Sequence, residues 1–272
     1  MKKFLSILCV VVLICGLSCG LSGCEQEKGE FRVGLECAYA PFNWTQQDDS
    51  NGAVPIEGGG YAGGYDVEIA KIIAEGLGKE LVIVKTAWEG LPQALQSGTI
   101  DAIIAGMSPT AERKETIDFT DNYYKSDLVM VVKKGGPYEN ATSIQDFSGA
   151  KITAQLGTFH YTVIEQIEGV DQQTAMDDFT AMRVALESGI IDGYVSERPE
   201  GISATSANAN FAMVEFEDGF VASDDDVAIA AGIKKGNDEL REQINEILAG
   251  ISEEQRVELM DAAIRNQPSE QN

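Results

Sequence analysis

Hydrophobic positions in this chain follow two patterns: short apolar runs, typical of buried strands, and longer stretches with an apolar stripe, typical of helices. Residues 66–77 show the helical pattern, because apolar side chains cover one broad face while Glu68, Lys71 and Glu75 lie on the other. The two patterns alternate, which predicts an α/β protein. The predicted strands are 31–36, 81–86, 100–105, 128–132, 151–155, 170–175, 190–195 and 227–233. The predicted helices are 66–77, 89–97, a helix after Thr158, 178–187 and two helices that begin near Asp238 and Ser252.

A repeat divides the body of the chain into two similar halves. The segment 94–102 (ALQSGTIDA) recurs 91 residues later as 185–193 (ALESGIIDG). In each copy a helix ends at a glycine suited to a left-handed cap, and a short apolar strand follows. Helix-glycine-strand is a common pattern in α/β proteins, but the agreement in Ala-Leu, Ser-Gly and Ile-Asp together favours two related lobes.

The chain is predicted to cross between these lobes twice. Strand 128–132 follows Tyr123 and Tyr124, and the polar run 223–226 precedes the apolar stretch that begins at Val227. A crossing at each place makes the first lobe discontinuous. The predicted lobes are 30–124 plus 228–267 for the first and 128–222 for the second.

The first residues are predicted to be an export signal rather than part of the fold. Two lysines precede an apolar run, 4–17, that is short for a membrane span and has the layout of a secretory signal peptide. The run Leu21-Ser22-Gly23-Cys24 resembles the lipobox of bacterial lipoproteins, in which cleavage leaves the cysteine as a lipidated N-terminus. We expect a signal peptide at 1–23, a tether at 24–30, and a lipid on Cys24 that anchors the protein to the outer side of the cell membrane. An uncleaved membrane anchor is the alternative.

The amino-acid composition argues against several classes of function. The 272 residues include 44 acidic and 20 basic side chains, and the net charge of −24 argues against nucleic-acid binding. Cleavage before Cys24 removes two lysines and no acid, so the charge becomes −26. A single histidine excludes a multi-histidine metal site, and no phosphate-binding loop is visible, so we expect no metal or cofactor. Only Cys37 would remain unmodified after processing, so an apolar core rather than an internal disulfide must hold the fold.

The residues after the first repeat strand are candidates for ligand binding, because ligands of open α/β sheets lie at the carboxyl ends of strands. Gly106, Met107 and Ser108 lie there. Ser108 before Pro109 predicts an N-cap and the start of a helix that carries Arg113. A carboxylate could accept hydrogen bonds from this guanidinium and from backbone N–H groups, although Arg113 could equally be a solvated helix residue.

The second repeat strand leads to an acid. The 91-residue offset places Glu197 at the position that Gly106 holds in the first copy. If the lobes face each other across a cleft, Arg113 meets an anion and Glu197 meets a cation, which are the two poles of a zwitterionic amino acid. An acid that stabilises a helix N-terminus is the structural alternative for Glu197.

Other predicted strands also end in polar or aromatic residues. Glu36 and Tyr39 lie at the end of the first strand, and Trp88 follows strand 81–86, so all three are expected near the cleft. The two rings could hold an aliphatic or cationic side chain between them, although each could also belong to the core. His160 is expected near a helix terminus, and a ligand contact is its alternative role.

Several motifs together resemble one family, the substrate-binding proteins of bacterial polar amino acid ABC transporters. The resemblance covers residues 31–268 and implies a two-lobed, periplasmic-binding-protein-like fold whose discontinuous lobes are joined by two hinge strands. The motifs are Tyr39-Ala40-Pro41-Phe42, Gly64-Tyr65-Asp66-Val67, Trp88-Glu89-Gly90-Leu91, Ala105 to Arg113, Asp118 to Tyr124, and Gln155-Leu156-Gly157-Thr158.

The resemblance also implies roles for single residues. It places the substrate α-carboxylate on Arg113, Ser108, Thr158 and the Phe159 N–H, and the α-ammonium on the Gly106 carbonyl, Ser108 and Glu197. Tyr39 and Trp88 would flank the side chain, and Glu36 matches an acidic position that contacts the distal polar group. The family usually has Asp where this chain has Glu197, so a longer acid must be accommodated.

By resemblance, the protein is a monomer that closes on a free amino acid and delivers it to an ABC permease. A dehydratase-like enzyme on the same scaffold is an alternative, but Glu197 or His160 would then act as general base without a visible partner. A sensor that feeds a membrane kinase is a third alternative.

The candidate substrates differ in their side chains. Glu36, the two aromatic residues and the negative charge favour a cationic amino acid, arginine or lysine. Glutamine and histidine stay open, because a carboxylate also accepts hydrogen bonds from an amide. An acidic amino acid would place like charges together and is excluded. The sequence assigns no role to Cys37, to His160 or to the Gly-rich insert 46–64, which lacks periodicity and is expected on the surface.

Overall fold

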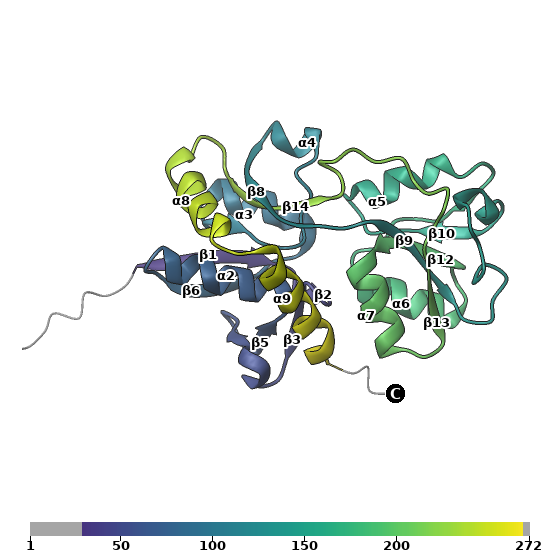
Figure 1. Ribbon diagram of the computed structural model, residues 1–272, viewed down its shortest axis with the longest axis horizontal. Coiled ribbons are helices and arrows are strands. Elements are labelled where there is room, and N and C mark those ends of the chain that lie inside the picture. Colours follow the sequence, from purple (N-terminus) through teal and green to yellow (C-terminus); the bar gives the residue numbers. More distant parts are fainter. Residues whose placement is uncertain (1–28, 269–272) are drawn as a thin grey trace, which may run out of the picture.

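The computed structural model describes residues 29–268, which form two α/β lobes that lie side by side (Figure 1). The first lobe contains a sheet with strand order β6-β1-β7-β14-β8, and the second a sheet with order β11-β10-β12-β9-β13. The strands of the first sheet are β1 (Glu30–Leu35), β6 (Glu80–Lys85), β7 (Ala102–Ile103), β8 (Ile117–Lys125) and β14 (Ala228–Lys234). Those of the second sheet are β9 (Leu128–Lys133), β10 (Lys151–Thr153), β11 (Asp171–Gln172), β12 (Gly193–Glu197) and β13 (Phe211–Val214).

Both lobes contain helices in addition to their sheets. The first lobe contains α2 (Tyr65–Gly76), α3 (Leu91–Ser97), α4 (Ala111–Lys114), α8 (Asp238–Ala249) and α9 (Glu253–Asn266), and the second contains α5 (Phe159–Thr162), α6 (Phe179–Ser188) and α7 (Arg198–Ala207). Short 3-10 helices span Ser50–Gly52, Trp88–Gly90, Ile144–Phe147 and Val163–Gln166. The apolar stripe predicted for α2 is buried, since Val67, Ile69 and Ile73 are fully covered while Glu75 is exposed. Each such buried side chain stabilises the fold by about 1.5–3 kcal/mol.

The internal repeat predicted from the sequence is present in the fold. α3 and α6 both end at a left-handed glycine, Gly98 with φ 78° and Gly189 with φ 76°. The strands that follow, β7 and β12, hold the third position in their sheets. In each sheet an antiparallel fourth strand follows three parallel strands, β14 in the first lobe and β9 in the second.

The chain passes between the lobes twice, and the two passages contact each other. β8 leads through Ser126 and Asp127 into β9, and a longer segment after β13 leads into β14. The Ser126 N–H donates to the Val227 carbonyl at 3.0 Å. Figure 1 shows both passages between the lobes, so the predicted two-lobed α/β fold with two connecting strands is confirmed.

Three features differ from the sequence prediction. β8 and β13 were missed by the apolar pattern, and both are edge strands of their sheets. The first repeat strand was expected over 100–105 but is only two residues long, although its flanking residues are buried. The insert 46–64 contributes to a third, small sheet with order β2-β3-β5-β4. Its strands are β2 (Ala38–Tyr39), β3 (Asn43–Gln46), β4 (Val54–Pro55) and β5 (Tyr61–Gly63).

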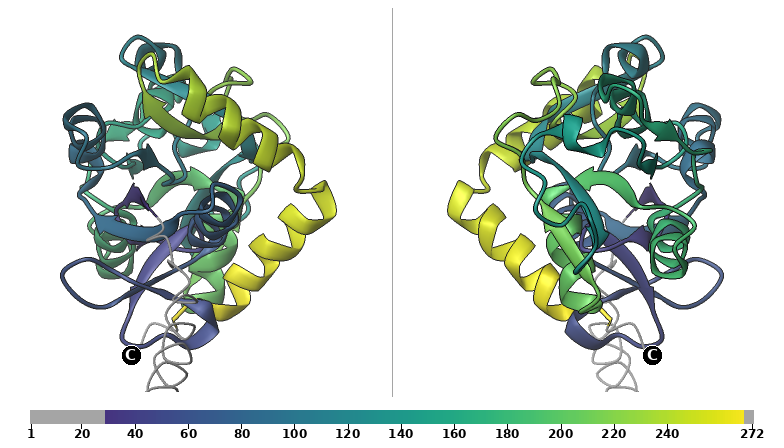
Figure 2. Two further views of the ribbon diagram at one scale, coloured as in Figure 1. Left: turned by 90° about the vertical axis from the view of Figure 1, so that its left-hand side faces the viewer. Right: turned by 90° about the vertical axis from the view of Figure 1, so that its right-hand side faces the viewer.

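The C-terminal helices run along one side of the molecule, as the end-on views in Figure 2 show. α9 reaches the second lobe, where Gln267 Nε2 donates to the Ser203 carbonyl at 3.3 Å. Between residues 29 and 268, no helix is long and apolar enough to cross a membrane. The predicted signal peptide at 1–23, the lipidated Cys24 and most of the tether lie outside the described residues.

Candidate functional site

The candidate site lies where strand ends from the two lobes meet. Glu36 follows β1 and Gly106 follows β7 in the first lobe, while Gln155 follows β10 and Glu197 ends β12 in the second. Four contacts cross directly between the lobes at this place. They are Tyr39 hydroxyl to Glu197 Oε2 at 3.1 Å, Gln155 Nε2 to Glu36 Oε2 at 3.0 Å, Arg113 Nη2 to the Gly157 carbonyl at 3.0 Å, and the stacked rings of Tyr39 and Phe179 with centroids 4.2 Å apart.

The helix that carries Arg113 begins two residues later than the sequence predicted. α4 has four residues, and its N-cap is Thr110, whose side chain accepts the Arg113 N–H at 3.3 Å. The prediction that Ser108 caps this helix was therefore wrong. Ser108 and Pro109 belong to the preceding loop, because Thr110 has the extended backbone and the side-chain bond that a cap requires.

The guanidinium of Arg113 is fixed by three neighbours. Nη1 donates to the Ser108 carbonyl at 2.9 Å, Nη2 donates to Gly157 of the opposite lobe, and the group lies 5.1 Å from the centre of the Trp88 ring. Burial lowers the pKa of Arg113 to about 10, which still leaves it charged at neutral pH. A rigid, desolvated guanidinium is suited to bind a carboxylate.

The loop after β7 is fixed by hydrogen bonds that lead to a buried acid, Asp66. Gly106 has φ 62°, and its N–H donates to the Tyr123 hydroxyl at 3.2 Å. That hydroxyl donates to Asp66 Oδ1 at 2.7 Å, and Asn43 Nδ2 donates to Asp66 Oδ2 at 2.8 Å. Burial raises the pKa of Asp66 to about 7 despite these hydrogen bonds. The chain of contacts fixes the loop, and the Met107 carbonyl accepts a further bond from β14.

Glu197 lies between an aromatic residue of the first lobe and the single histidine. It is 1% exposed, and its Oε2 accepts the Tyr39 hydroxyl. His160, 6% exposed, places Nε2 3.5 Å from Glu197 Oε1, an ion pair when the ring is protonated. Among residues 29–268, Glu197 Oε1 and both His160 nitrogens have no hydrogen-bond partner. Buried polar atoms of this kind are stabilised by a bound polar ligand.

Glu36 lies in a similar environment at the other end of the site. It is 5% exposed, its Oε2 accepts Gln155 Nε2, and its Oε1 has no partner in the described part of the chain. Burial, together with the fields of Asp178 and Asp66, raises the pKa of Glu36 to about 8, although the Gln155 hydrogen bond lowers it. The carboxyl therefore favours its neutral form until a cation or a donor reaches it.

The remaining predicted residues lie near the same contact between the lobes. Thr158 precedes α5 and donates its hydroxyl to the Gln155 carbonyl at 2.7 Å. Phe159 is half-buried, with its ring 4.5 Å from that of His160. Met107, Ser108 and Trp88 are buried.

Sequence reasoning missed three residues of this site. Gln155 and Asp66 occur in the motifs quoted for the resemblance, but no role was inferred for either one. Gln155 could have been found, because it ends a predicted strand and so falls under the same rule as Glu197. Phe179 follows the N-cap of a helix, and no sequence signal indicates that its ring stacks on Tyr39.

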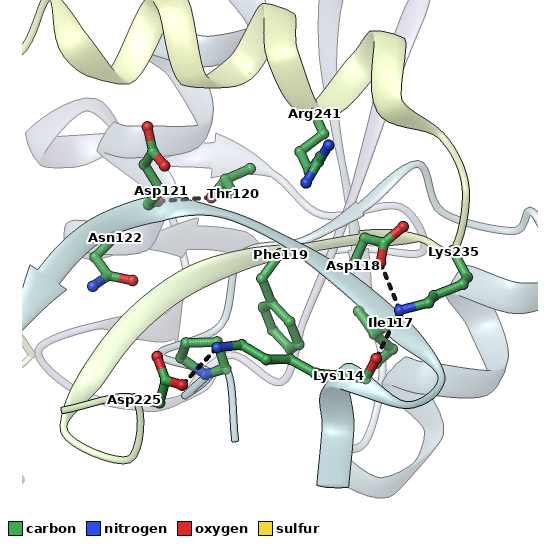
Figure 3. Close-up of a pocket in the computed structure, with 11 residues that line it drawn as sticks. Lys114, Ile117, Asp118, Phe119, Thr120, Asp121, Asn122, Asp225, Lys235 and Arg241 are labelled. Atoms are coloured by element: carbon green, nitrogen blue, oxygen red, sulfur yellow. Dashed lines mark hydrogen bonds and ion pairs between the residues drawn. The ribbon is translucent and has the colours of Figure 1, made fainter. Parts of the chain in front are cut away.

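A separate surface pocket of about 420 Å³ lies between β8 and α8 (Figure 3). Its lysines are already paired, Lys114 with Asp225 at 2.6 Å and Lys235 with Asp118 at 2.7 Å. Throughout residues 29–268, no cluster of His, Cys, Asp and Glu side chains is arranged to hold a metal ion.

Two lobes that meet at buried, charged side chains are the arrangement of proteins that bind a small solute between two domains. The chain belongs to the bacterial extracellular solute-binding proteins, family 3, which it matches over residues 31–262. This confirms the predicted family resemblance. It also confirms the prediction of a binding protein rather than an enzyme, because the family and the relatives described next are substrate-binding proteins.

Among similar proteins, the arginine-binding extracellular protein ArtP of Bacillus subtilis (strain 168) is 31% identical over 161 residues, 58% of this chain and 57% of that protein. The L-cystine-binding protein TcyJ of Escherichia coli (strain K12) is 34% identical over 171 residues, 60% of each chain. The chain thus matches less than two thirds of the length of either relative.

One similar solved structure is the amino acid ABC transporter substrate-binding protein AbpA from Streptococcus pneumoniae Canada MDR_19A bound to L-arginine. It superposes with a TM-score of 0.74 at 26% identity and covers 87% of this chain and 95% of that one.

Proposed function

We propose that this chain binds a free amino acid with a cationic side chain, arginine or lysine, between its lobes and presents it to an ABC permease. The observation that carries the proposal is the pair of opposite charges where the two lobes meet, a half-buried Arg113 and a buried Glu197. Arg113 comes from the first lobe and contacts the second, while Glu197 comes from the second lobe and contacts the first. A zwitterion placed between them meets a complementary charge at each pole.

The backbone end of the substrate is assigned to groups on both lobes. Arg113 would bind the α-carboxylate, with help from the Ser108 hydroxyl, Thr158 and the Phe159 N–H. The α-ammonium would bind Glu197, Ser108 and the Gly106 carbonyl, while Met107 shapes the loop. Support for the ammonium site comes from Glu197 Oε1, which is buried without a hydrogen-bond partner among residues 29–268.

The side-chain end is assigned to Glu36, with Tyr39 and Trp88 beside the aliphatic part. The fields of Asp178 and Asp66 disfavour a further negative charge beside Glu36, which favours a cation over an acidic side chain. Two similar proteins support a cationic substrate, because ArtP is an arginine-binding protein and AbpA was solved bound to L-arginine. Glutamine and histidine are second candidates, because Glu36 Oε1 can also pair with an uncharged donor.

Binding is proposed to work by closure of the lobes. A ligand that moves a two-state equilibrium from 1:99 to 99:1 must favour the closed state by about 5.5 kcal/mol. Arg113 and Glu197 belong to different lobes, so both charged contacts form at once only in the closed state, and we propose that they supply this difference. The chain is further proposed to act outside the cytoplasm as a monomer, anchored by a lipid on Cys24 that lies outside the described residues.

A thermal-shift panel tests the proposal. The purified chain lacking residues 1–24 is mixed with each of the twenty amino acids, and its unfolding temperature is measured. The largest increase is expected with arginine or lysine, because only the closed, ligand-bound form gains the charged contacts. A response confined to glutamate or aspartate, or no response to any amino acid, would overturn the proposal.

A further inference from the structure

Two acidic side chains from different lobes act electrostatically on Glu36. They are Asp66, in the first turn of α2, and Asp178, the N-cap of α6 in the opposite lobe. Gln155, after β10, contacts Glu36 through an uncharged amide. The neighbouring Cys37 is a buried thiol whose pKa is raised to about 12 by burial, so it stays neutral.

Lys85, the cation whose field acts on the neighbouring Cys37, forms no ion pair with Glu36. Lys85 ends β6 and donates to Thr45 Oγ1 at 3.0 Å. Among residues 29–268, Glu36 has no salt-bridge partner within 4.0 Å, and its one hydrogen-bond donor is Gln155. An ionised carboxylate in this position is buried among like charges, which disfavours ionisation until a cation arrives.

We propose that Glu36 and Gln155 form a proton-linked specificity element, in which Glu36 releases its proton to solvent when it binds a cationic side chain and keeps it when it binds a neutral one. The inference rests on the proposed function, because it concerns the same crevice. In the exchange the carboxyl O–H bond breaks, its electron pair stays on the carboxylate, and the proton leaves with water or buffer. No covalent bond to the ligand forms.

Gln155 is a positioning residue in this scheme. Its amide donates both to Glu36 Oε2 and to the Asp177 carbonyl, each at 3.0 Å, so it holds one carboxylate oxygen in place. The donated bond stabilises the ionised form of Glu36 and leaves Oε1 free for the ligand. Removing that bond shifts the release of the proton to higher pH.

The consequence is a substrate preference that changes with pH. With a pKa of about 8 for Glu36, arginine must displace a proton from most molecules at pH 7. The affinity for arginine then rises roughly 50-fold between pH 6 and pH 8, and close to tenfold of this rise lies between pH 6 and pH 7. Citrulline, which has the shape of arginine with a neutral end group, shows no such rise.

Titration calorimetry of the purified protein in buffers of different ionisation enthalpy measures the released protons. At pH 7 arginine is expected to release about 0.9 proton per molecule bound, and citrulline none. Glu36→Gln should abolish the release. Gln155→Leu should move the release profile to higher pH, a shift that a merely structural role would not produce. Glu75→Gln, an exposed acid on α2, is the matched control and should behave as the wild type.

Two results overturn the inference while the proposed function stands. One is arginine binding with no proton release and equal affinity at pH 6 and pH 8. The other is full proton release in Glu36→Gln, provided that its thermal unfolding shows a folded protein, because another group would then titrate. If no amino acid binds at any pH, the proposed function fails as well, and the two failures are thereby distinguished.

Discussion

Burial is the property shared by the charged residues around the crevice. Glu36, Asp66 and Glu197 are each at most 5% exposed, and the ionised form of such groups is stabilised only by hydrogen bonds or by an opposite charge. Asp66 receives two hydrogen bonds from side chains, whereas Glu36 and Glu197 each keep one oxygen without a partner within the described chain. Asp66 therefore fixes the loop after β7, whereas Glu36 and Glu197 each have an oxygen atom that can bind a ligand.

The raised pKa of Asp66 predicts a pH dependence of stability. The folded protein keeps a proton on Asp66 up to about pH 7, whereas the unfolded chain loses it near pH 4, so the free energy of unfolding falls as pH rises between these values. Asp66→Asn should remove the Asp66 contribution to this fall, which is worth roughly 3 kcal/mol at most between pH 5 and pH 8, and should leave the contribution of Glu36 in place. Urea denaturation of the ligand-free protein at both pH values measures it.

The matched control for this prediction is Asp261→Asn, an exposed acid on α9. It should lose stability between pH 5 and pH 8 as the wild type does. Equal slopes for Asp66→Asn and the wild type would show that the Asp66 carboxyl does not titrate in this range.

At the scale of elements, the loop after β7 depends on a glycine. A Cβ on Gly106 would lie 2.7 Å from Tyr39 Cε1, and its φ of 62° is unfavourable for other residues. Gly106→Ala should therefore lower stability by about 1–3 kcal/mol and weaken amino-acid binding, because Tyr39 must move away from Glu197. Denaturation and calorimetry measure the two effects.

Gly98→Ala separates the effect of the positive φ from the effect of the contact with Tyr39. Gly98 also has a positive φ, 78°, but a Cβ there meets no atom within 4 Å. The control should lose stability and retain its affinity for the amino acid. A Gly106→Ala protein that binds as tightly as Gly98→Ala would contradict the role given to the Gly106–Tyr39 contact.

Strong local signals made most elements predictable from the sequence. The glycines that end α3 and α6 and the Ser252 cap of α9 lie where the chain pattern placed them. β8 escaped because it is an edge strand that carries polar side chains in place of an apolar run. β13 is apolar but has only four residues, Phe211–Val214, which is too few for a strand period to appear. The small sheet escaped because several of its strands have two or three residues, too few for a period to appear.

Only part of the candidate site was predictable, because some of its contacts join residues of different lobes. Strand ends identified Glu36, Gly106 and Glu197, since sheet geometry brings such residues to one edge. The partners that come from the opposite lobe, such as Phe179 on Tyr39, depend on how the lobes meet. No pattern within one segment contains that information.

At the scale of the whole molecule, the net charge of −24 predicts that cationic amino acids are attracted before they bind. The association rate of arginine should fall as salt concentration rises, because ions screen this attraction over about 10 Å at 0.1 M. The rate for neutral citrulline should change much less. Stopped-flow tryptophan fluorescence measures both, and equal salt dependence for the two ligands would contradict the prediction.

The account as a whole depends on Arg113 binding the α-carboxylate of the substrate. The most direct test is calorimetric titration of the wild type and Arg113→Ala with arginine and with agmatine, which lacks that carboxylate. The wild type should prefer arginine by at least about 100-fold, and the preference should shrink to a few-fold in Arg113→Ala, because both changes remove the same interaction. Arg241→Ala, on α8, should keep the wild-type preference. An undiminished preference for arginine in Arg113→Ala would contradict the account.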